Sequence, residues 1–201
     1  MGEISIKHLS GKEIEPWIPD LARLRITVFR DFPYLYDGTI EYEEHYLQTY
    51  LETPDSIAVL ALDGDKVIGA STGLPMADET PEFQEPFISL GYDPAKVFYC
   101  AESVLLKEYR GRGVYTHFFT GREGHARSLS RFDWACFCGV WRPADHPLRP
   151  ADYVPLDAIW NKFGYVKQPE ISTFYRWKDI DQTEETDHEM VFWLKSLQEA
   201  R

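Results

Sequence analysis

One segment limits the fold of this chain more than any other: a strand that runs into a glycine-rich turn and then into a helix. Residues 97–106 are almost all apolar or β-forming, which is typical of a strand at the centre of a sheet. Arg110-Gly111-Arg112-Gly113 follows, and residues 113–129 have the pattern of a helix. A strand, a tight turn and a helix in this order indicate helices packed on a sheet.

The rest of the chain also alternates between strand and helix patterns. The predicted strands cover residues 4–9, 56–62, 66–74, 132–140, 172–177 and 189–194, and the predicted helices cover 21–29, 41–51 and 156–163. Residues 75–96, rich in proline and acid, and residues 142–155, rich in proline, are predicted loops. We therefore predict an α/β fold with one domain over residues 1–201, built on a central mixed sheet of about seven strands flanked by helices.

Composition excludes several functional classes. The formal charge of −12 and the pI of about 4.9 disfavour nucleic acid as a partner, whereas a cationic small molecule or a basic peptide would be tolerated. No apolar run is long enough to span a bilayer, and the first residues do not resemble a signal peptide, so we expect a cytoplasmic protein without a membrane partner. Cys136 and Cys138 lack the spacing of a metal or redox pair and are interpreted as buried thiols, and no metal site is predicted.

The glycine-rich turn has the chemistry of a phosphate-binding loop. Its backbone N–H groups and the dipole of the following helix favour an anion, and the glycines let a phosphate approach closely. Arg110 and Arg112 add positive charge for a pyrophosphate. The loop is neither a Walker A sequence nor Gly-x-Gly-x-x-Gly. A plain tight turn remains the alternative.

The segment resembles the signature of the GNAT superfamily of N-acetyltransferases, Gln/Arg-x-x-Gly-x-Gly/Ala. Arg110 and Gly113 match its first two positions, and residues 159–165 and the order of strands and helices also resemble the family. The resemblance implies a GNAT-like fold and acetyl-CoA as the acyl donor. It also implies that backbone amides of the loop hold the pyrophosphate and that the strand before it contacts pantetheine, with Leu105 N–H stabilising the oxyanion. The implied donor-binding residues are Leu105, Leu106, Arg110, Gly111, Arg112, Gly113, Val114 and Tyr115.

Two positions depart from the family pattern. Tyr115 replaces a small residue in the third position of the signature. Trp160 stands where many members carry a tyrosine that protonates the leaving thiolate, and tryptophan cannot perform that step. Either another acid serves, such as Tyr153 or Tyr165, or the thiolate leaves unaided.

Candidate residues for the acceptor side follow from their places in the chain. Glu102 lies in the apolar strand, where its pKa would be raised and it could act as a base, or where it could instead pair with an arginine. Arg142, His146 and Arg149 follow the fifth predicted strand and could bind a substrate carboxylate, although Asp–Arg pairing within the loop is an alternative. Tyr34 lies between the first two predicted helices, with aromatic neighbours that form either a pocket wall or simple packing.

The predicted function is acetyl transfer from acetyl-CoA to a primary amine by direct attack in a ternary complex. The acceptor is a small molecule or a peptide whose identity stays open, because the acidic loop at 75–96 suggests a cation and the loop at 142–149 suggests an anion. A coenzyme A-binding or sensory module without catalysis is the first alternative, and an unrelated nucleotide-phosphate binder is the second. Exposed aromatic residues would suit a homodimer.

Overall fold

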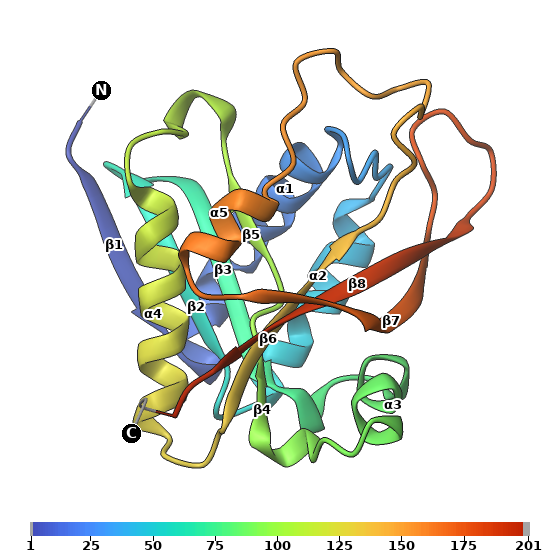
Figure 1. The fold of residues 1–201 in the computed structure, drawn as a ribbon. Coiled ribbons are helices and arrows are strands. Elements are labelled where there is room, and N and C mark those ends of the chain that lie inside the picture. The colour runs from blue at the N-terminus through green and yellow to red at the C-terminus, as the bar shows by residue number, and fades with distance from the viewer. Residues whose placement is uncertain (1, 199–201) are drawn as a thin grey trace.

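Eight strands join in one mixed sheet in a computed structural model of the chain, which describes residues 2–198 (Figure 1). The strands are β1 (Ile4–Leu9), β2 (Ile57–Asp63), β3 (Lys66–Pro75), β4 (Val97–Tyr99), β5 (Ser103–Leu105), β6 (Trp134–Val140), β7 (Val166–Trp177) and β8 (Thr186–Ser196). The helices are α1 (Ile18–Phe29), α2 (Ile40–Glu52), α3 (Pro81–Ser89), α4 (Val114–Ser128) and α5 (Asp157–Lys162). The α/β class with a mixed sheet is confirmed.

The strand order is β1-β2-β3-β4-β6-β8-β7, with β5 paired to β3 beside β4. Only β4 and β6 run parallel, and every other pair in this order is antiparallel. The predicted hairpin is present, because Gly64 adopts the positive φ of +60° that a tight turn between β2 and β3 requires. The last two strands, β7 and β8, are longer than their sequence patterns indicated.

The strand predicted over residues 97–106 is interrupted. β4 bonds to β6 as far as the Cys100 N–H, which donates to Cys136 O at 2.7 Å. Beyond this point β5 pairs only with β3, while β6 continues along β8. The sheet therefore opens between β5 and β6, and the split strand explains why the sheet has eight strands rather than about seven.

The sequence suggested that residues 75–96 form a loop, but this segment contains helices. It contains two 3₁₀ helices, Met76–Asp78 and Pro94–Lys96, with α3 between them. Phe83 and Phe87 lie one helical turn apart on α3, and both rings contact Phe192 of β8 edge-on, with centroids at 6.0 and 4.9 Å. Pro81 at the start of α3 and Pro86 within it hid this short amphipathic pattern in the sequence.

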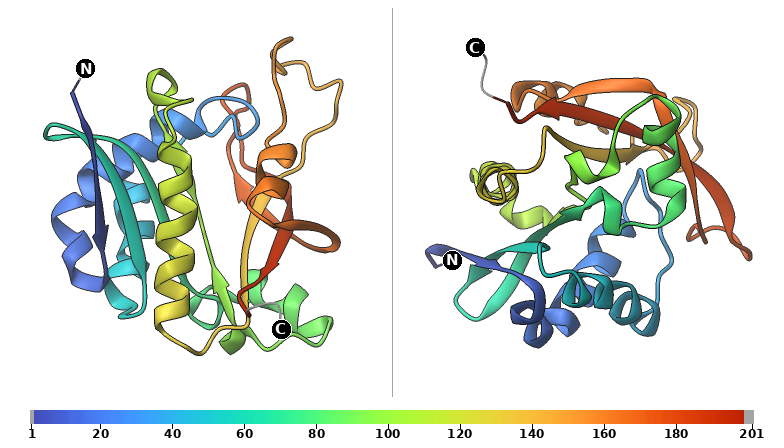
Figure 2. Two further views of the ribbon diagram at one scale, coloured as in Figure 1. Left: turned by 60° about the vertical axis from the view of Figure 1, so that its left-hand side comes forward. Right: turned by 90° about the horizontal axis from the view of Figure 1, so that it is seen from below.

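The hydrophobic core has two parts, one on each face of the sheet. α1, α2 and α3 cover one face, where Leu21, Leu47 and Phe87 are buried, and α4 covers the other with Phe118 and Phe119 (Figures 1 and 2). Successive residues along the central strands alternate between the two parts, so that Tyr99 and Cys138 belong to the first and Cys100 and Phe137 to the second. The opening between β5 and β6 thus connects the two faces.

Candidate active site

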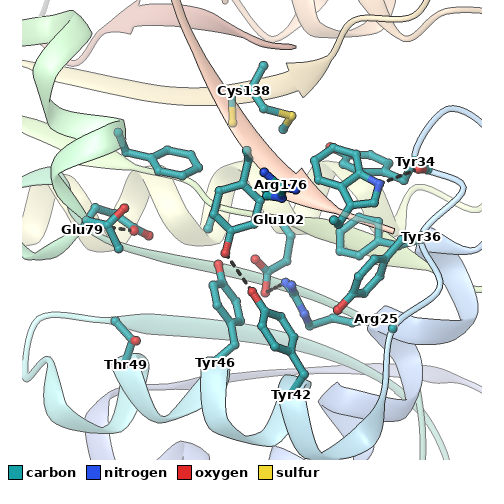
Figure 3. Close-up of a pocket in the computed structure, with 18 of the residues that line it drawn as sticks. Arg25, Tyr34, Tyr36, Tyr42, Tyr46, Thr49, Glu79, Glu102, Cys138 and Arg176 are labelled. Atoms are coloured by element: carbon teal, nitrogen blue, oxygen red, sulfur yellow. Dashed lines mark hydrogen bonds and ion pairs between the residues drawn. The ribbon is translucent and has the colours of Figure 1, made fainter. Parts of the chain in front are cut away.

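A cavity of about 580 Å³ lies on the α1–α2 face, beside the opening in the sheet. Ala101 and Glu102, in the break between β4 and β5, line it together with Cys138 of β6. Its walls are mainly aromatic, formed by Phe29, Tyr34, Tyr36, Tyr42, Tyr46, Tyr50, Phe83, Tyr99, Tyr175 and Trp177 (Figure 3). Such a cavity has the size and the apolar character of a small-molecule site.

A buried arginine holds two carboxylates at this cavity. Arg25 of α1 pairs through Nε with Glu43 of α2, and its Nη1 lies 2.8 Å from Glu102 Oε1. The guanidinium also packs over the ring of Tyr46, 4.4 Å from its centroid. Tyr50 donates to Glu102 Oε2 at 3.4 Å. The arginine-paired alternative for Glu102 is therefore observed, and the expected apolar surroundings are wrong.

Arg122 of α4 explains why the strand breaks at Glu102. This arginine is buried, and its Nη1 donates to the backbone carbonyl of Glu102 at 3.0 Å and to that of Thr72 at 3.5 Å. Thr72 N–H of β3 also donates to the Glu102 carbonyl, at 3.1 Å. The backbone at residue 102 is thus held by the neighbouring strand β3 and by α4. This arrangement is tertiary, and no local pattern in the sequence indicated it.

Glu79 is a second carboxylate of the cavity, and sequence reasoning missed it. It follows the 3₁₀ helix Met76–Asp78, and its Oε2 accepts a hydrogen bond from Thr80 N–H at 3.2 Å. Burial raises the pKa of Glu79 from 4.5 to about 7. The only sequence signal was its place in the acidic segment after β3. In Figure 3 it lies apart from Arg25, on the other side of Tyr46.

The strand β5 turns part of its backbone toward the opening. Its bonds to β3 involve even-numbered positions, since Leu106 N–H donates to Ile68 O and Glu102 O accepts from Thr72 N–H. By alternation, the N–H and C=O groups of Ser103 and Leu105 point away from β3, toward β6. Arg110 Nε donates to the Leu105 carbonyl from that side at 3.3 Å. This orientation is the one that the predicted oxyanion role of Leu105 requires.

The glycine-rich loop lies on the α4 face and leads into α4. Gly111 and Gly113 have φ values of +77° and +80°, and a Cβ at either position would meet no atom within 4 Å. The loop is anchored by Tyr109, whose hydroxyl donates to Asp63 Oδ2 at 2.8 Å. The first N–H groups of α4 have no partner within the helix. The loop thus offers open space and N–H groups that fit a phosphate.

Comparison with known proteins identifies the fold. No protein-family model matches the sequence, and no curated protein matches it by sequence. The structure is similar to that of an acetyltransferase of the GNAT family from Streptococcus pneumoniae, with a TM-score of 0.58 and 13% identity over 98% of this chain and 100% of that one. The chain has the GNAT fold.

Two further structures of similar fold were solved as complexes with coenzyme A or acetyl-CoA. An aminoglycoside 6′-N-acetyltransferase complexed with coenzyme A aligns with a TM-score of 0.59 and 14% identity over 98% of this chain and 99% of that one. NAA60 of Arabidopsis thaliana in complex with acetyl-CoA aligns with a TM-score of 0.60 and 12% identity over 96% and 98% of the two chains. These structural alignments establish the GNAT fold of the present chain. At identities this low they do not establish its activity, which is argued from the site.

Tyr115 and Trp160 meet on the α4 face of this GNAT fold. Trp160 Nε1 of α5 donates to the Tyr115 hydroxyl at 3.1 Å. The indole of Trp160 covers Gly139 of β6, where a Cβ would lie 3.0 Å from the ring. The Tyr115 hydroxyl also interacts with Ser103 of β5, and burial raises the pKa of Tyr115. The tyrosine therefore spans the opening between β5 and β6.

The other predicted site residues lie in different places. Tyr34 lines the cavity. Arg142 does not; its guanidinium pairs with Asp179 Oδ2 at 2.8 Å and donates to the carbonyls of Pro33 and Tyr34. Its expected role in substrate binding is thus corrected to a structural one, with Asp179 as the partner instead of a loop aspartate. His146 and Arg149 also lie outside the cavity, beside the ring of Phe32.

Neither a group of metal ligands nor a membrane-spanning helix occurs among the described residues, 2–198. They include no cluster of three or more histidine, cysteine, aspartate or glutamate side chains that could hold a metal ion. None of their helices has both the length and the apolar character needed to cross a membrane. The three cysteines are buried and free.

Proposed function

We propose that the protein is an acetyl-CoA-dependent N-acetyltransferase that acetylates a primary amine. The observation that carries the proposal is the opening between β5 and β6, which has the glycine-rich loop on one side and an aromatic, acidic cavity on the other. A donor bound at the loop and an acceptor bound in the cavity would meet at this opening. The coenzyme A and acetyl-CoA complexes among the structures of the same fold support the donor.

The residues of the chain support direct transfer in a ternary complex. The N–H groups of Gly111 to Val114 would hold the pyrophosphate, with Arg110 and Arg112 adding charge. Leu105 N–H would donate to the carbonyl oxygen as negative charge develops on it. Placing both reactants at one opening supplies the proximity that such transfers require.

A proton donor for the leaving thiolate is also available. Tyr165 is fully buried and Tyr153 lies in the loop after β6, so neither candidate from the sequence lies at the opening. The Tyr115 hydroxyl does, and the hydrogen bond from Trp160 Nε1 fixes its position. We assign Tyr115 as the group that gives the thiolate its proton, with Trp160 as a positioning residue.

A coenzyme A-binding module without catalysis is the second candidate. The observation that favours it is the same Tyr115–Trp160 contact, because it spans the opening through which the thioester would reach the cavity. Amine-dependent release of thiol from acetyl-CoA would exclude this alternative. Binding of acetyl-CoA without any amine-dependent release would support it.

Donor binding is tested by comparing two glycines with the same backbone conformation. Gly113 and Gly91 have φ values of +80° and +83°, and a Cβ at either would meet no atom within 4 Å. Gly113→Ala and Gly91→Ala should therefore lose similar stability, about 1–2 kcal/mol. Only Gly113→Ala should weaken acetyl-CoA binding, by about tenfold or more in calorimetry, because its Cβ enters the phosphate space. Equal affinities in the two variants would remove the loop assignment, and stabilisation by ATP but not acetyl-CoA would favour a nucleotide binder.

A further inference from the structure

The carboxylates that line the cavity differ in what they are bound to. Glu102 is held by Arg25 and Tyr50, and Glu43 shares the same arginine. The charge of Glu102 is therefore already stabilised by a fixed cation within a network of side chains. Both oxygens of Glu102 already have partners, Oε1 in Arg25 and Oε2 in Tyr50, which leaves Glu102 a poor acceptor for a substrate proton even though one arginine does not neutralise two carboxylates.

Glu79 has no such partner. Among residues 2–198, no lysine, arginine or histidine forms an ion pair with it, and its hydrogen bond is to the N–H of the adjacent residue Thr80. It lies on the cavity wall near the rings of Phe83 and Tyr46, where burial disfavours its charge. A cationic ligand entering the cavity would supply the missing counter-charge.

Most of the charged side chains at the rim of the cavity pair with one another. Lys178 Nζ lies 2.6 Å from Asp37 Oδ2, and Arg176 lies 3.7 Å from Glu185 and 3.9 Å from Asp187. Among residues 2–198, each cation that lines the cavity is thus paired, so the rim offers no free cation for a substrate carboxylate, whereas Asp78 is exposed there without an ion pair. Behind the rim the walls are aromatic, so the part of the ligand that fills the cavity must be apolar.

We propose that the cavity takes a monoamine carried on an aromatic or branched apolar body, and that Glu79 accepts the proton which this amine loses. This proposal rests on the proposed acetyltransferase function and deepens it. The rings would hold the apolar body and would also attract the ammonium group before it is deprotonated.

The proton balance of the step is complete. The bound ammonium transfers one proton to the Glu79 carboxylate, and the neutral nitrogen attacks the thioester carbonyl. The C–N bond forms and the C–S bond breaks, with the electron pair leaving on sulfur. The second proton of the nitrogen replaces the one that Tyr115 gives to the thiolate. Glu79 then releases its proton to solvent, so the products are an amide, free coenzyme A and one proton.

Other titratable groups face Glu79, and they bear on any pH profile. Those that interact electrostatically with it are Arg25, Tyr46, Tyr50, Tyr99, Glu102, Cys136, Cys138 and Tyr175, and Asp78, its neighbour in the chain, also lines the cavity. Burial raises the pKa of each of these tyrosines and of Cys138, which makes them poorer bases than a carboxylate near neutrality.

The test uses 2-phenylethylamine, spermidine and glutamate as acceptors, with thiol release from acetyl-CoA as the readout. 2-Phenylethylamine should have the highest kcat/KM, by about tenfold or more, because the walls of the cavity are mainly aromatic. Glu79→Gln should lower kcat for this amine by about 100-fold to 10,000-fold near pH 7. The deficit should shrink above about pH 9, where free amine is abundant. Glu79→Asp should keep part of the rate, because it retains the carboxylate.

The matched control is Glu85→Gln, on the exposed side of α3 and outside the cavity. It should leave kcat unchanged, and no variant should change the affinity for acetyl-CoA. A Glu79→Gln enzyme with normal kcat at every pH would overturn the assignment of Glu79. A preference for spermidine or glutamate would overturn the ligand class while leaving the acetyltransferase function in place.

Failure of the proposed function has a different signature. If acetyl-CoA does not bind, no transfer occurs, and the cavity is then tested by direct binding of 2-phenylethylamine, followed through tryptophan fluorescence. Binding that weakens in Glu79→Gln and not in Glu85→Gln would support the amine site. No binding to the wild-type protein would overturn it.

Discussion

Arg25 determines which of the nearby carboxylates is available for chemistry. It lies in α1, 77 positions before Glu102 in the chain, and it binds Glu102 and Glu43 in the buried floor of the cavity. Glu79 has no ion pair among the described residues, and its pKa is raised mainly by burial, with a further rise from the charge of Glu102. The sequence pattern favoured Glu102 as a base because it sits among apolar strand residues, and the tertiary contacts are the reason that we propose Glu79 for that role instead.

The raised pKa of Glu79 predicts a pH-dependent stability. The folded protein keeps the Glu79 proton up to about pH 7, whereas the unfolded chain releases it near 4.5. The stability that this proton contributes is present below about 4.5 and is lost as the pH rises through about 7. Glu79→Gln should therefore be more stable than the wild type at high pH, by at most about 3 kcal/mol, because one pKa unit corresponds to about 1.4 kcal/mol.

Urea unfolding across this pH range measures the difference. The advantage of Glu79→Gln over the wild type should grow between about pH 5 and 7 and then level off. Glu85→Gln, exposed on α3, should show no comparable rise. A constant difference for Glu79→Gln at all pH values would mean that Glu79 ionises alike in the folded and unfolded states.

At the scale of elements, the contact between α4 and α5 links the donor loop to the opening in the sheet. Tyr115 lies in the first turn of α4 and accepts a hydrogen bond from Trp160 of α5. Its ring also packs edge-on against Phe119 and Phe163, with centroids at 5.2 and 6.2 Å. The two departures from the family pattern are thus one physical contact.

Removal of single hydroxyl groups tests this contact. Tyr115→Phe keeps the ring and its packing but removes the proton donor, so kcat should fall by up to about 100-fold with acetyl-CoA affinity nearly unchanged. Tyr153→Phe, in the loop after β6, should leave kcat unchanged. The measurement is thiol release at saturating acetyl-CoA. A loss of rate in Tyr153→Phe, and not in Tyr115→Phe, would show that Tyr153 protonates the leaving thiolate.

At the scale of the whole molecule, one ion pair joins three segments that are far apart in the sequence. Arg142, after β6, binds Asp179 between β7 and β8 and also the carbonyls of Pro33 and Tyr34. Trp177 Nε1 donates to the same Tyr34 carbonyl and to Asp179 Oδ1, both at 3.0 Å. This junction supports the wall of the cavity that carries Tyr34 and Trp177.

Breaking this junction should destabilise the protein strongly. Arg142→Met leaves the buried Asp179 carboxylate without its cation, which typically costs about 3–5 kcal/mol. Arg149→Met, in the same loop, removes only contacts with the rings of Phe32 and Tyr153 and should cost about 1 kcal/mol or less. Denaturant unfolding compares the two. Similar losses of unfolding free energy in both variants would show that Arg142 does not stabilise the buried Asp179 carboxylate.

The sequence alone predicted what depends on neighbours along the chain. Turn chemistry at Gly64, helical periodicity in α1, α2 and α4, and the run of strand, glycine loop and helix are local, so they indicated the sheet and the donor loop. The acceptor side was decided only in the tertiary structure. Arg122 from α4 and Arg25 from α1 both contact Glu102 at the break, and the lack of an ion pair at Glu79 depends on which cations lie near it. Pairing of buried charges depends on distances between elements remote in sequence, which no local pattern encodes.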